Sequence, residues 1–259
     1  MNETIPRAID ALRVRDRVVP SIGRAIQVAG RLMSDKAQEH LLYGLVRRLR
    51  ILHHGLLKIV AVAYPRRKQP LSYAEQLDLS LHLNSFYLHI RGCLDNLAWC
   101  LVHELQLFGL EVREDAIASR VNLFGEAFLQ KLVSMAPELA VLVRKHVDWQ
   151  RDLKNIRDPV AHRIPIYAVP AMLSADETER YRSVCQREEA ARAIGDLDQT
   201  ARLLEELDGI GYYVPCFAQL PSDNVSLRKV YPQVADDLSM VLQLADEIIG
   251  DLDRRLQQR

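Results

Sequence analysis

The chain has 259 residues, of which 49% are hydrophobic and 6% aromatic, so it can bury a core without disulfides or a structural metal. Its formal net charge is zero, but residues 1–68 hold 14 Lys/Arg against 5 Asp/Glu, and residues 174–259 hold 10 against 17. This composition excludes bulk disorder. The uneven charge predicts either a local polyanion contact on the basic third or two ends of opposite charge that face each other.

Apolar residues recur at three- and four-residue steps along most of the chain and predict an all-α, antiparallel helical bundle. Helices are expected over residues 37–63, 72–108, 137–156, 175–207 and 233–256, with Leu94, Leu97, Leu101, Leu153 and Ile156 in the core. Ser174 and Glu177 form a capping-box pattern that begins the fourth helix. Residues 212–232 are interpreted as a long loop. A single domain over residues 1–259 is the simplest organisation, with residues 1–35 as a possible separate N-terminal arm.

The cysteines and the apolar stretches indicate the compartment. Four cysteines show no CxxC pair and no spacing typical of a zinc site, which favours a reduced, cytoplasmic setting. No apolar run has the length of a signal peptide or a membrane span, because His53, His54 and Lys58 interrupt the most apolar stretch, residues 51–64. The sequence therefore predicts no membrane association.

Several histidines and aromatic residues are further candidate ligands. His82, His89 and His103 share one face of the second helix but are too far apart along it to bind one metal, so no metal and no cofactor is expected. Trp99 lies among apolar neighbours and is expected in the core. In the late loop, Tyr212, Tyr213 and Phe217 are either exposed stacking residues or anchors over the end of the bundle.

The segment from Leu153 to Arg163 concentrates polar residues at an expected bend. Pro159 is expected to stop the third helix, with Asp158 as an N-cap and Pro159 as the first position of a new turn. Arg157 and His162 would then project to one side. Histidine can move a proton near neutral pH and arginine can hold phosphate oxygens, so this pair suits metal-free phosphodiester chemistry.

The spacing of Arg157 and His162 resembles the Arg-x4–6-His signature of HEPN domains, helical bundles of which several members are metal-independent ribonucleases. Asparagine is frequent directly after the arginine in that family, and here Asp158 replaces it and adds negative charge. Family members often carry an acidic residue near the pair on the preceding long helix, and Asp95 matches it here. The resemblance covers residues 37–256 in architecture but only a few positions in motif.

The resemblance implies a function and a set of site residues. His162 would act as general acid or base on the RNA 2′-hydroxyl, Arg157 would stabilise the transition state, and Asp95 would orient the pair. The substrate-binding candidates are Asp158, Arg163, Arg91 and Asn155. The family also implies a homodimer whose two Arg/His pairs face each other, and a protein partner such as an antitoxin is compatible with it.

Two alternatives stay open. The same residues could lock a bend in a non-catalytic interaction or regulatory module, with Arg157 paired to Asp95. The protein could also bind RNA or a nucleotide without cleaving it, and a strong salt dependence of binding would mark that case.

Overall fold

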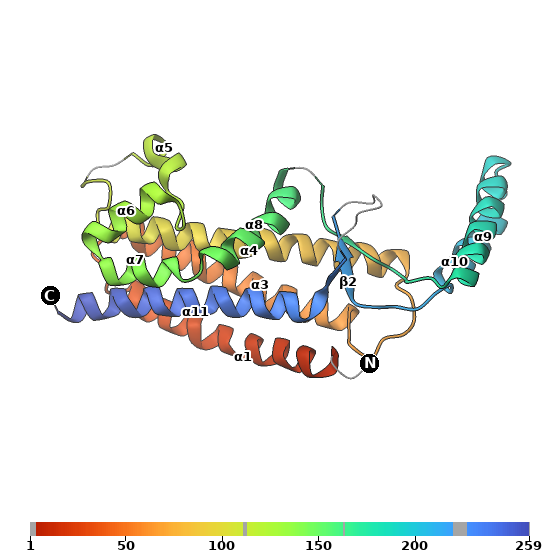
Figure 1. The fold of residues 1–259 in the computed structure, drawn as a ribbon, viewed down its shortest axis with the longest axis horizontal. Coiled ribbons are helices and arrows are strands. Elements are labelled where there is room, and N and C mark those ends of the chain that lie inside the picture. The colour runs from red at the N-terminus through yellow and green to blue at the C-terminus, as the bar shows by residue number, and fades with distance from the viewer. Residues whose placement is uncertain (1–3, 111–112, 163, 220–226, 259) are drawn as a thin grey trace.

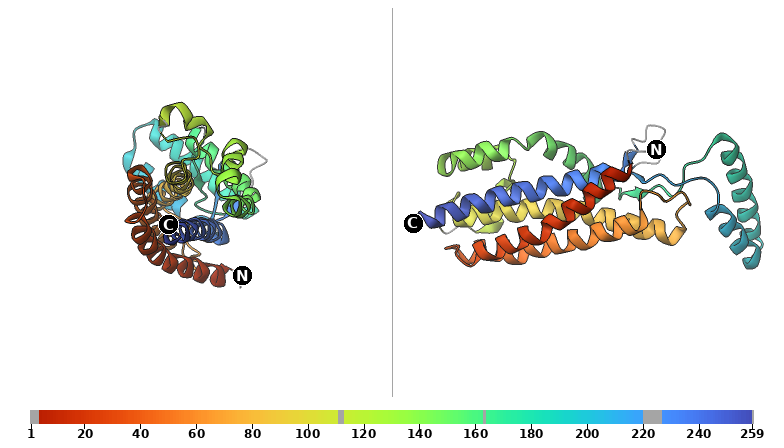
Figure 2. Two further views of the ribbon diagram at one scale, coloured as in Figure 1. Left: turned by 90° about the vertical axis from the view of Figure 1, so that its left-hand side faces the viewer. Right: turned by 90° about the horizontal axis from the view of Figure 1, so that it is seen from below.

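The computed structural model describes residues 4–110, 113–162, 164–219 and 227–258, and it is mostly helical, as predicted. Long helices lie side by side: α1 (Thr4–Ala29), α3 (Arg47–Val62), α4 (Tyr73–Glu104) and α11 (Val230–Gln257) (Figures 1 and 2). Shorter helices cover one side of them, namely α5 (Glu114–Ile117), α6 (Glu126–Met135), α7 (Pro137–Arg144) and α8 (Val147–His162). The five residues predicted for the core, Leu94, Leu97, Leu101, Leu153 and Ile156, are all buried. Within the described residues, no helix combines the length and apolar character needed to cross a membrane.

The N-terminal helix α1 packs along α11 and belongs to the bundle, so the alternative of a separate arm does not describe it. Basic residues of α1 and of the turn after it meet acidic residues of α11: Arg24 pairs with Asp246 at 3.4 Å, and Arg31 pairs with Asp253. The uneven charge of the sequence therefore arises in part from two ends that face each other, which leaves less of the basic third for a polyanion.

The helix predicted over residues 37–63 has a more complex structure. A short helix, α2 (Asp35–Glu39), leads into a π-helical segment, η1 (His40–Val46), which continues as α3. Here η1 and α4 approach so closely that a Cβ added to Gly44 would lie 2.3 Å from the amide nitrogen of Asn96. Glycine therefore permits the contact between these two helices.

A small antiparallel sheet was not predicted. Strands β1 (Tyr167–Ala168), β2 (Cys216–Ala218) and β3 (Arg228–Lys229) pair in the order β1-β2-β3, with Tyr167 opposite Ala218 and Cys216 opposite Lys229. The described part of the expected loop, residues 212–232, thus forms two strands and the start of α11. Phe217 and Tyr213 are buried and act as anchors, whereas Tyr212 is exposed.

The single helix predicted over residues 175–207 is wrong. The chain forms two helices, α9 (Ala175–Ala193) and α10 (Leu197–Asp208), which pack together and project from one end of the bundle (Figures 1 and 2). Gly195 breaks the helix with a φ of +74°, and the Asp196 side chain caps α10 by accepting a hydrogen bond from the amide of Gln199. A Gly-Asp pair combines a C-terminal stop with an N-cap, and this signal was present in the sequence.

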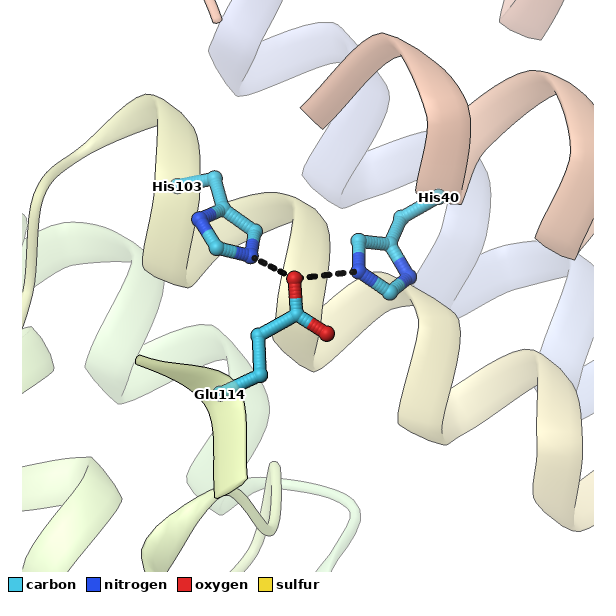
Figure 3. A group of neighbouring side chains, drawn as sticks. All are labelled: His40, His103 and Glu114. Carbon is cyan, nitrogen blue, oxygen red and sulfur yellow. Dashed lines mark ion pairs between the residues drawn. The ribbon is translucent and has the colours of Figure 1, made fainter. Parts of the chain in front are cut away.

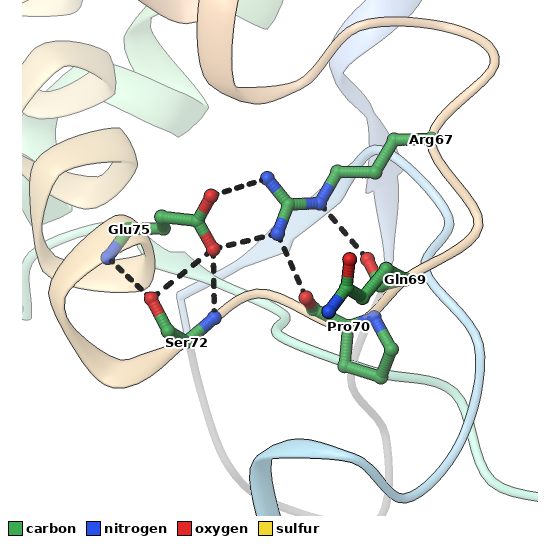
Figure 4. A network of polar contacts seen from close by, with 5 residues as sticks. All are labelled: Arg67, Gln69, Pro70, Ser72 and Glu75. Atoms are coloured by element: carbon green, nitrogen blue, oxygen red, sulfur yellow. Dashed lines mark hydrogen bonds and ion pairs between the residues drawn. The ribbon is translucent and has the colours of Figure 1, made fainter.

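A polar clamp closes the connection between α3 and α4 (Figure 4). The Arg67 guanidinium, whose side chain is 8% exposed, donates two hydrogen bonds of 2.6 Å to the Glu75 carboxylate and one of 2.8 Å to the carbonyl of Pro70. Glu75 also accepts a hydrogen bond from the amide of Ser72, which completes a capping box at the start of α4. The hydrogen bonds from Arg67 lower the pKa of Glu75 to about 2.

We expect Glu75→Gln to lower the free energy of unfolding by about 1–2 kcal/mol at neutral pH, since solvent partly screens this carboxylate. The folded pKa lies below the ordinary value of 4.5, so the stabilisation is present above pH 4.5 and is lost as the pH falls toward 2. Urea unfolding at several pH values should show wild type and variant converging on the acid side. Glu179→Gln, which removes an exposed ion pair with Arg182, is the matched control and should change stability little. A gap between wild type and Glu75→Gln that is independent of pH would contradict this role for the clamp.

Candidate functional site

Helix α8 carries the Arg157 segment and does not end where the sequence predicted. It runs through Pro159 to His162, so the expected break at Pro159 and the expected N-cap role of Asp158 are both wrong. Proline removes one amide donor to the carbonyl four residues earlier, that of Asn155, which lies on an exposed side of the helix where water can replace it. The side chain of Gln219 in addition donates to the carbonyl of Ile156.

The real interruption in this region lies about three helix turns before Arg157. The helix predicted over 137–156 is divided into α7 and α8 by Lys145 and His146. Arg157 therefore lies well inside α8, and its direction is set by the helix and not by a bend.

Helix α8 is attached to α11 by a buried polar contact. The indole nitrogen of Trp149 donates a hydrogen bond of 2.9 Å to the carboxylate of Asp237, which is 1% exposed. Gln233 donates to the other carboxylate oxygen at 2.9 Å. This contact and the buried side chains of Leu153 and Ile156 hold the helix that carries Arg157.

Arg157 lies within a small group of charged side chains. Its Nη1 is 3.0 Å from Oδ1 of Asp158, and Nζ of Lys154 is 4.0 Å from the other oxygen of the same carboxylate. The Arg157 side chain is only 19% exposed, so α8 and its neighbours restrict its position. On α4, Arg91 pairs with Asp95 at 2.9 Å.

The charge of Arg157 reaches Asp95 across the contact between α4 and α8. Removal from bulk water raises the pKa of the Asp95 carboxyl, and the charges of Arg91, then Arg157 and Arg48, act in the opposite direction. Three arginines on three helices, Arg91, Arg157 and Arg48, thus act on this carboxyl through their charges.

A pocket of about 260 Å³ opens at this point, and it is lined by Arg91, Asn122, Gln150, Leu153, Lys154, Arg157 and Asp158. Its lining is mostly polar, with three cationic side chains and one carboxylate. Such a pocket is small compared with the roughly 300–1,000 Å³ of drug-sized sites, and its size and charge suit a single phosphate group. Of the other predicted residues, Asn155 is exposed on α8 outside this lining. Arg163 lies outside the described residues, and for His162 only the backbone is described.

Arg48 is a residue that the sequence analysis did not identify. From α3 its Nε donates to Asn96 at 2.9 Å, and its Nη1 lies 3.2 Å from Nδ1 of His89. The guanidinium crosses α4 at Gly92, where an added Cβ would lie 2.3 Å from it. Gly44 and Gly92 lie in the interior of helical segments, where glycine is uncommon. Their presence was the signal that a polar side chain of the neighbouring helix passes close to the backbone there.

Comparisons of the chain with protein-family models, with curated proteins and with solved structures found no match.

Proposed function

We propose that this protein is an RNA-directed, HEPN-like helical bundle that cleaves RNA without a metal at the pocket between α4 and α8. The observation that carries the proposal is the convergence of Arg91, Lys154 and Arg157 on a small polar pocket, within charge reach of Asp95. The Arg-x4-His spacing from Arg157 to His162 adds the group that can move a proton.

Each residue has a distinct role in this proposal. The Lys154 side chain, 62% exposed, attracts the RNA backbone, and Arg91 and Arg157 hold the oxygens of one phosphate as charge builds on them. His162 takes the proton from the 2′-hydroxyl, whose oxygen attacks the phosphorus. The bond from phosphorus to the 5′-oxygen breaks, and the leaving 5′-oxygen takes up a proton from water. The products are a 2′,3′-cyclic phosphate end and a 5′-hydroxyl end. Asp95 orients Arg91 and Arg157 and is a positioning residue.

We further propose that the protein acts as a homodimer. Leu81 and Leu88 are 64% and 44% exposed on α4, and Asp95 follows at the same seven-residue step. Residues seven positions apart on a helix differ in direction by only about 20°, so all three share one face. An apolar stripe thus leads along α4 to the pocket, and two copies joined there would bring two pockets together. Light scattering should give twice the mass of one 29.6 kDa chain, and Leu81→Glu should give a monomer. A monomeric wild type at micromolar concentration would exclude this arrangement.

The function is tested by incubating the purified protein with unstructured RNA and with DNA of the same sequence, both in EDTA. We expect the RNA to be cut and the DNA to stay intact, because the 2′-hydroxyl is the nucleophile and no metal is required. Mass spectrometry of the fragments should find 2′,3′-cyclic phosphate ends. Intact RNA across a panel of sequences would contradict the proposal.

A non-catalytic interaction module is the second candidate, and the α9–α10 hairpin favours it. This hairpin has a small core of its own, formed by Val184, Ala191, Leu203 and Ile210, apart from the main core of the bundle. At its tip Ile194 and Leu197 are 81% and 77% exposed, so the hairpin presents two large apolar side chains that would fit a partner. Intact RNA in the assay above, together with no salt-dependent binding of RNA, would favour this candidate. RNA binding that weakens steeply with salt, without cleavage, would favour a binding protein.

A further inference from the structure

Three chemically matched side chains meet at the end of the bundle near α5 (Figure 3). His40 begins the π-helical segment η1, His103 lies near the end of α4, and Glu114 is the first residue of α5. Nε2 of His103 is 3.2 Å from Oε1 of Glu114, and Nε2 of His40 is 4.0 Å from the same oxygen. One nitrogen or oxygen atom from each of the three residues lies within 4.8 Å of the others.

These separations are close to those of a zinc site. With zinc–ligand distances of about 2.0–2.1 Å, tetrahedral ligand atoms lie about 3.4 Å apart. The pair of His103 and Glu114 already has this spacing, and Nε2 of His40 lies about 0.6 Å beyond it from the Glu114 oxygen. Two histidines and one glutamate are also a ligand set that zinc enzymes use.

The two imidazole rings are held in place by Trp99. The indole is nearly parallel to the ring of His40, at 11°, and to that of His103, at 19°, with ring centroids 5.7 Å apart in each case. The imidazole centroids themselves are 5.5 Å apart. Since this packing restricts rotation of both rings, the ligand atoms are preorganised. The half-buried position of Trp99 differs from the expected core position and serves this contact.

The charges of the cluster are compatible with a bound cation. Burial lowers the pKa of both His40 and His103, which favours the neutral form in which histidine binds metals. Lys36, whose side chain is 55% exposed, holds the carboxylate of Glu114 at 3.2 Å. A divalent ion would replace this ammonium group beside the same carboxylate.

The cluster borders an open groove at this end of the bundle. This groove has a volume of about 1070 Å³, and its lining includes His103, Lys36, Gln106 and Arg113. Of the three candidate ligands, His103 itself lines this groove. Three protein ligands with one position left open are typical of catalytic zinc sites, whereas structural sites are closed by four. Twelve residues of α4, about 18 Å at roughly 1.5 Å per residue, separate His103 from Arg91, so this site is distinct from the pocket at Arg157.

We propose that His40, His103 and Glu114 bind one divalent transition-metal ion, with zinc as the best match, and that its remaining coordination position opens into this groove.

The competing explanation is that the three residues only tie α5 to the bundle through hydrogen bonds. Lys36 separates the two explanations. In a metal site Lys36 competes with the ion, so Lys36→Met should tighten zinc binding. In a purely structural contact Lys36→Met removes one partner of Glu114 and should only lower stability.

The test is a calorimetric titration of the metal-free full chain with Zn²⁺. We expect one zinc per chain, and His103→Ala and Glu114→Gln should each weaken binding by at least about 100-fold, since each removes a direct ligand. His54→Ala removes an exposed histidine on α3 and is the matched control, which should bind like wild type. Glu114→Gln changes a short helix at the surface, so it remains informative if His103→Ala folds poorly.

Substitution with Co²⁺ adds a readout of geometry. The intense visible bands of four-coordinate cobalt should appear with wild type and Lys36→Met and be absent from Glu114→Gln. Absence of zinc binding, or equal zinc affinity in wild type, His103→Ala and Glu114→Gln, would overturn the proposal and leave adventitious binding by surface histidines. RNA cleavage is assayed in EDTA, so failure of either proposal does not affect the other.

Discussion

Arg157→Ala is expected to reduce RNA cleavage by at least about 100-fold while leaving the melting temperature close to that of wild type. The guanidinium stabilises the charge that develops on the phosphate, and loss of such a group typically costs two or more orders of magnitude in rate. The fold should tolerate the change, because among the described residues Arg157 forms an ion pair with its neighbour Asp158 on the same helix and not with a distant element. Initial rates on one RNA in EDTA, with thermal melts in parallel, provide the measurement.

His162→Ala should have an effect of similar size for a different reason, since it removes the group that moves the proton. The pH dependence of the cleavage rate gives a further readout. The rise in rate that follows deprotonation of the general base in wild type should be absent from any residual activity of this variant. Arg151→Ala is the matched control: it lies on the same helix, is 69% exposed, pairs with Asp148, and is not part of the pocket lining. Both site variants unfolding together with loss of activity would make the Arg/His pair a structural lock.

Asp237→Ala is expected to lower the free energy of unfolding by about 2–4 kcal/mol. The substitution leaves the indole N–H of Trp149 and the side-chain amide of Gln233 without their acceptor in a buried position, and each unsatisfied donor costs about 1–3 kcal/mol. Relief of the burial of a carboxylate offsets part of this cost, since burial raises the pKa of Asp237. Urea unfolding followed by circular dichroism gives the value.

This substitution also tests whether the attachment of α8 positions the pocket. Under conditions where Asp237→Ala is still folded, we expect slower RNA cleavage although the residue is remote from the pocket lining, because Trp149 lies two turns before Arg157 on α8. Asp148→Ala, next to Trp149 but 91% exposed in an ion pair with Arg151, should stay within about 0.5 kcal/mol of wild type. Equal stability of Asp237→Ala and wild type would show that the buried contact does not hold α8.

Much of the helical framework could be predicted, because its signals are local. The period of apolar residues located α4 and α11 to within a few residues, and the Ser174 capping box marked the start of α9 correctly. The core positions Leu94 and Leu153 followed from the same period. The local rule that proline ends a helix failed at Pro159. Helix α8 continues there, because the last turns of a helix tolerate the loss of one exposed hydrogen bond.

The candidate sites show a similar division. The sequence predicted that Asp95 lies near Arg157, since a charged residue beside an apolar stripe needs a partner. In the structure the charge of Arg157 acts on the Asp95 carboxyl. It did not indicate Arg48, whose guanidinium reaches α4 only because Gly92 has no side chain. The three short strands were missed because two- and three-residue strands carry too little alternation to be recognised.

The sequence by itself determined which segments are helical and which face of each helix is apolar, because propensity, capping and period act over neighbouring residues. Only the tertiary structure decided which polar side chains meet: Trp149 with Asp237, and His40 with His103 and Glu114. Except for His103 and Glu114, these residues lie far apart in the chain. Their distances depend on how helices pack and on small features such as the π-helical turn of η1. A period along one helix carries no information on the rotation of its neighbour, so such contacts arise only when the whole bundle is assembled.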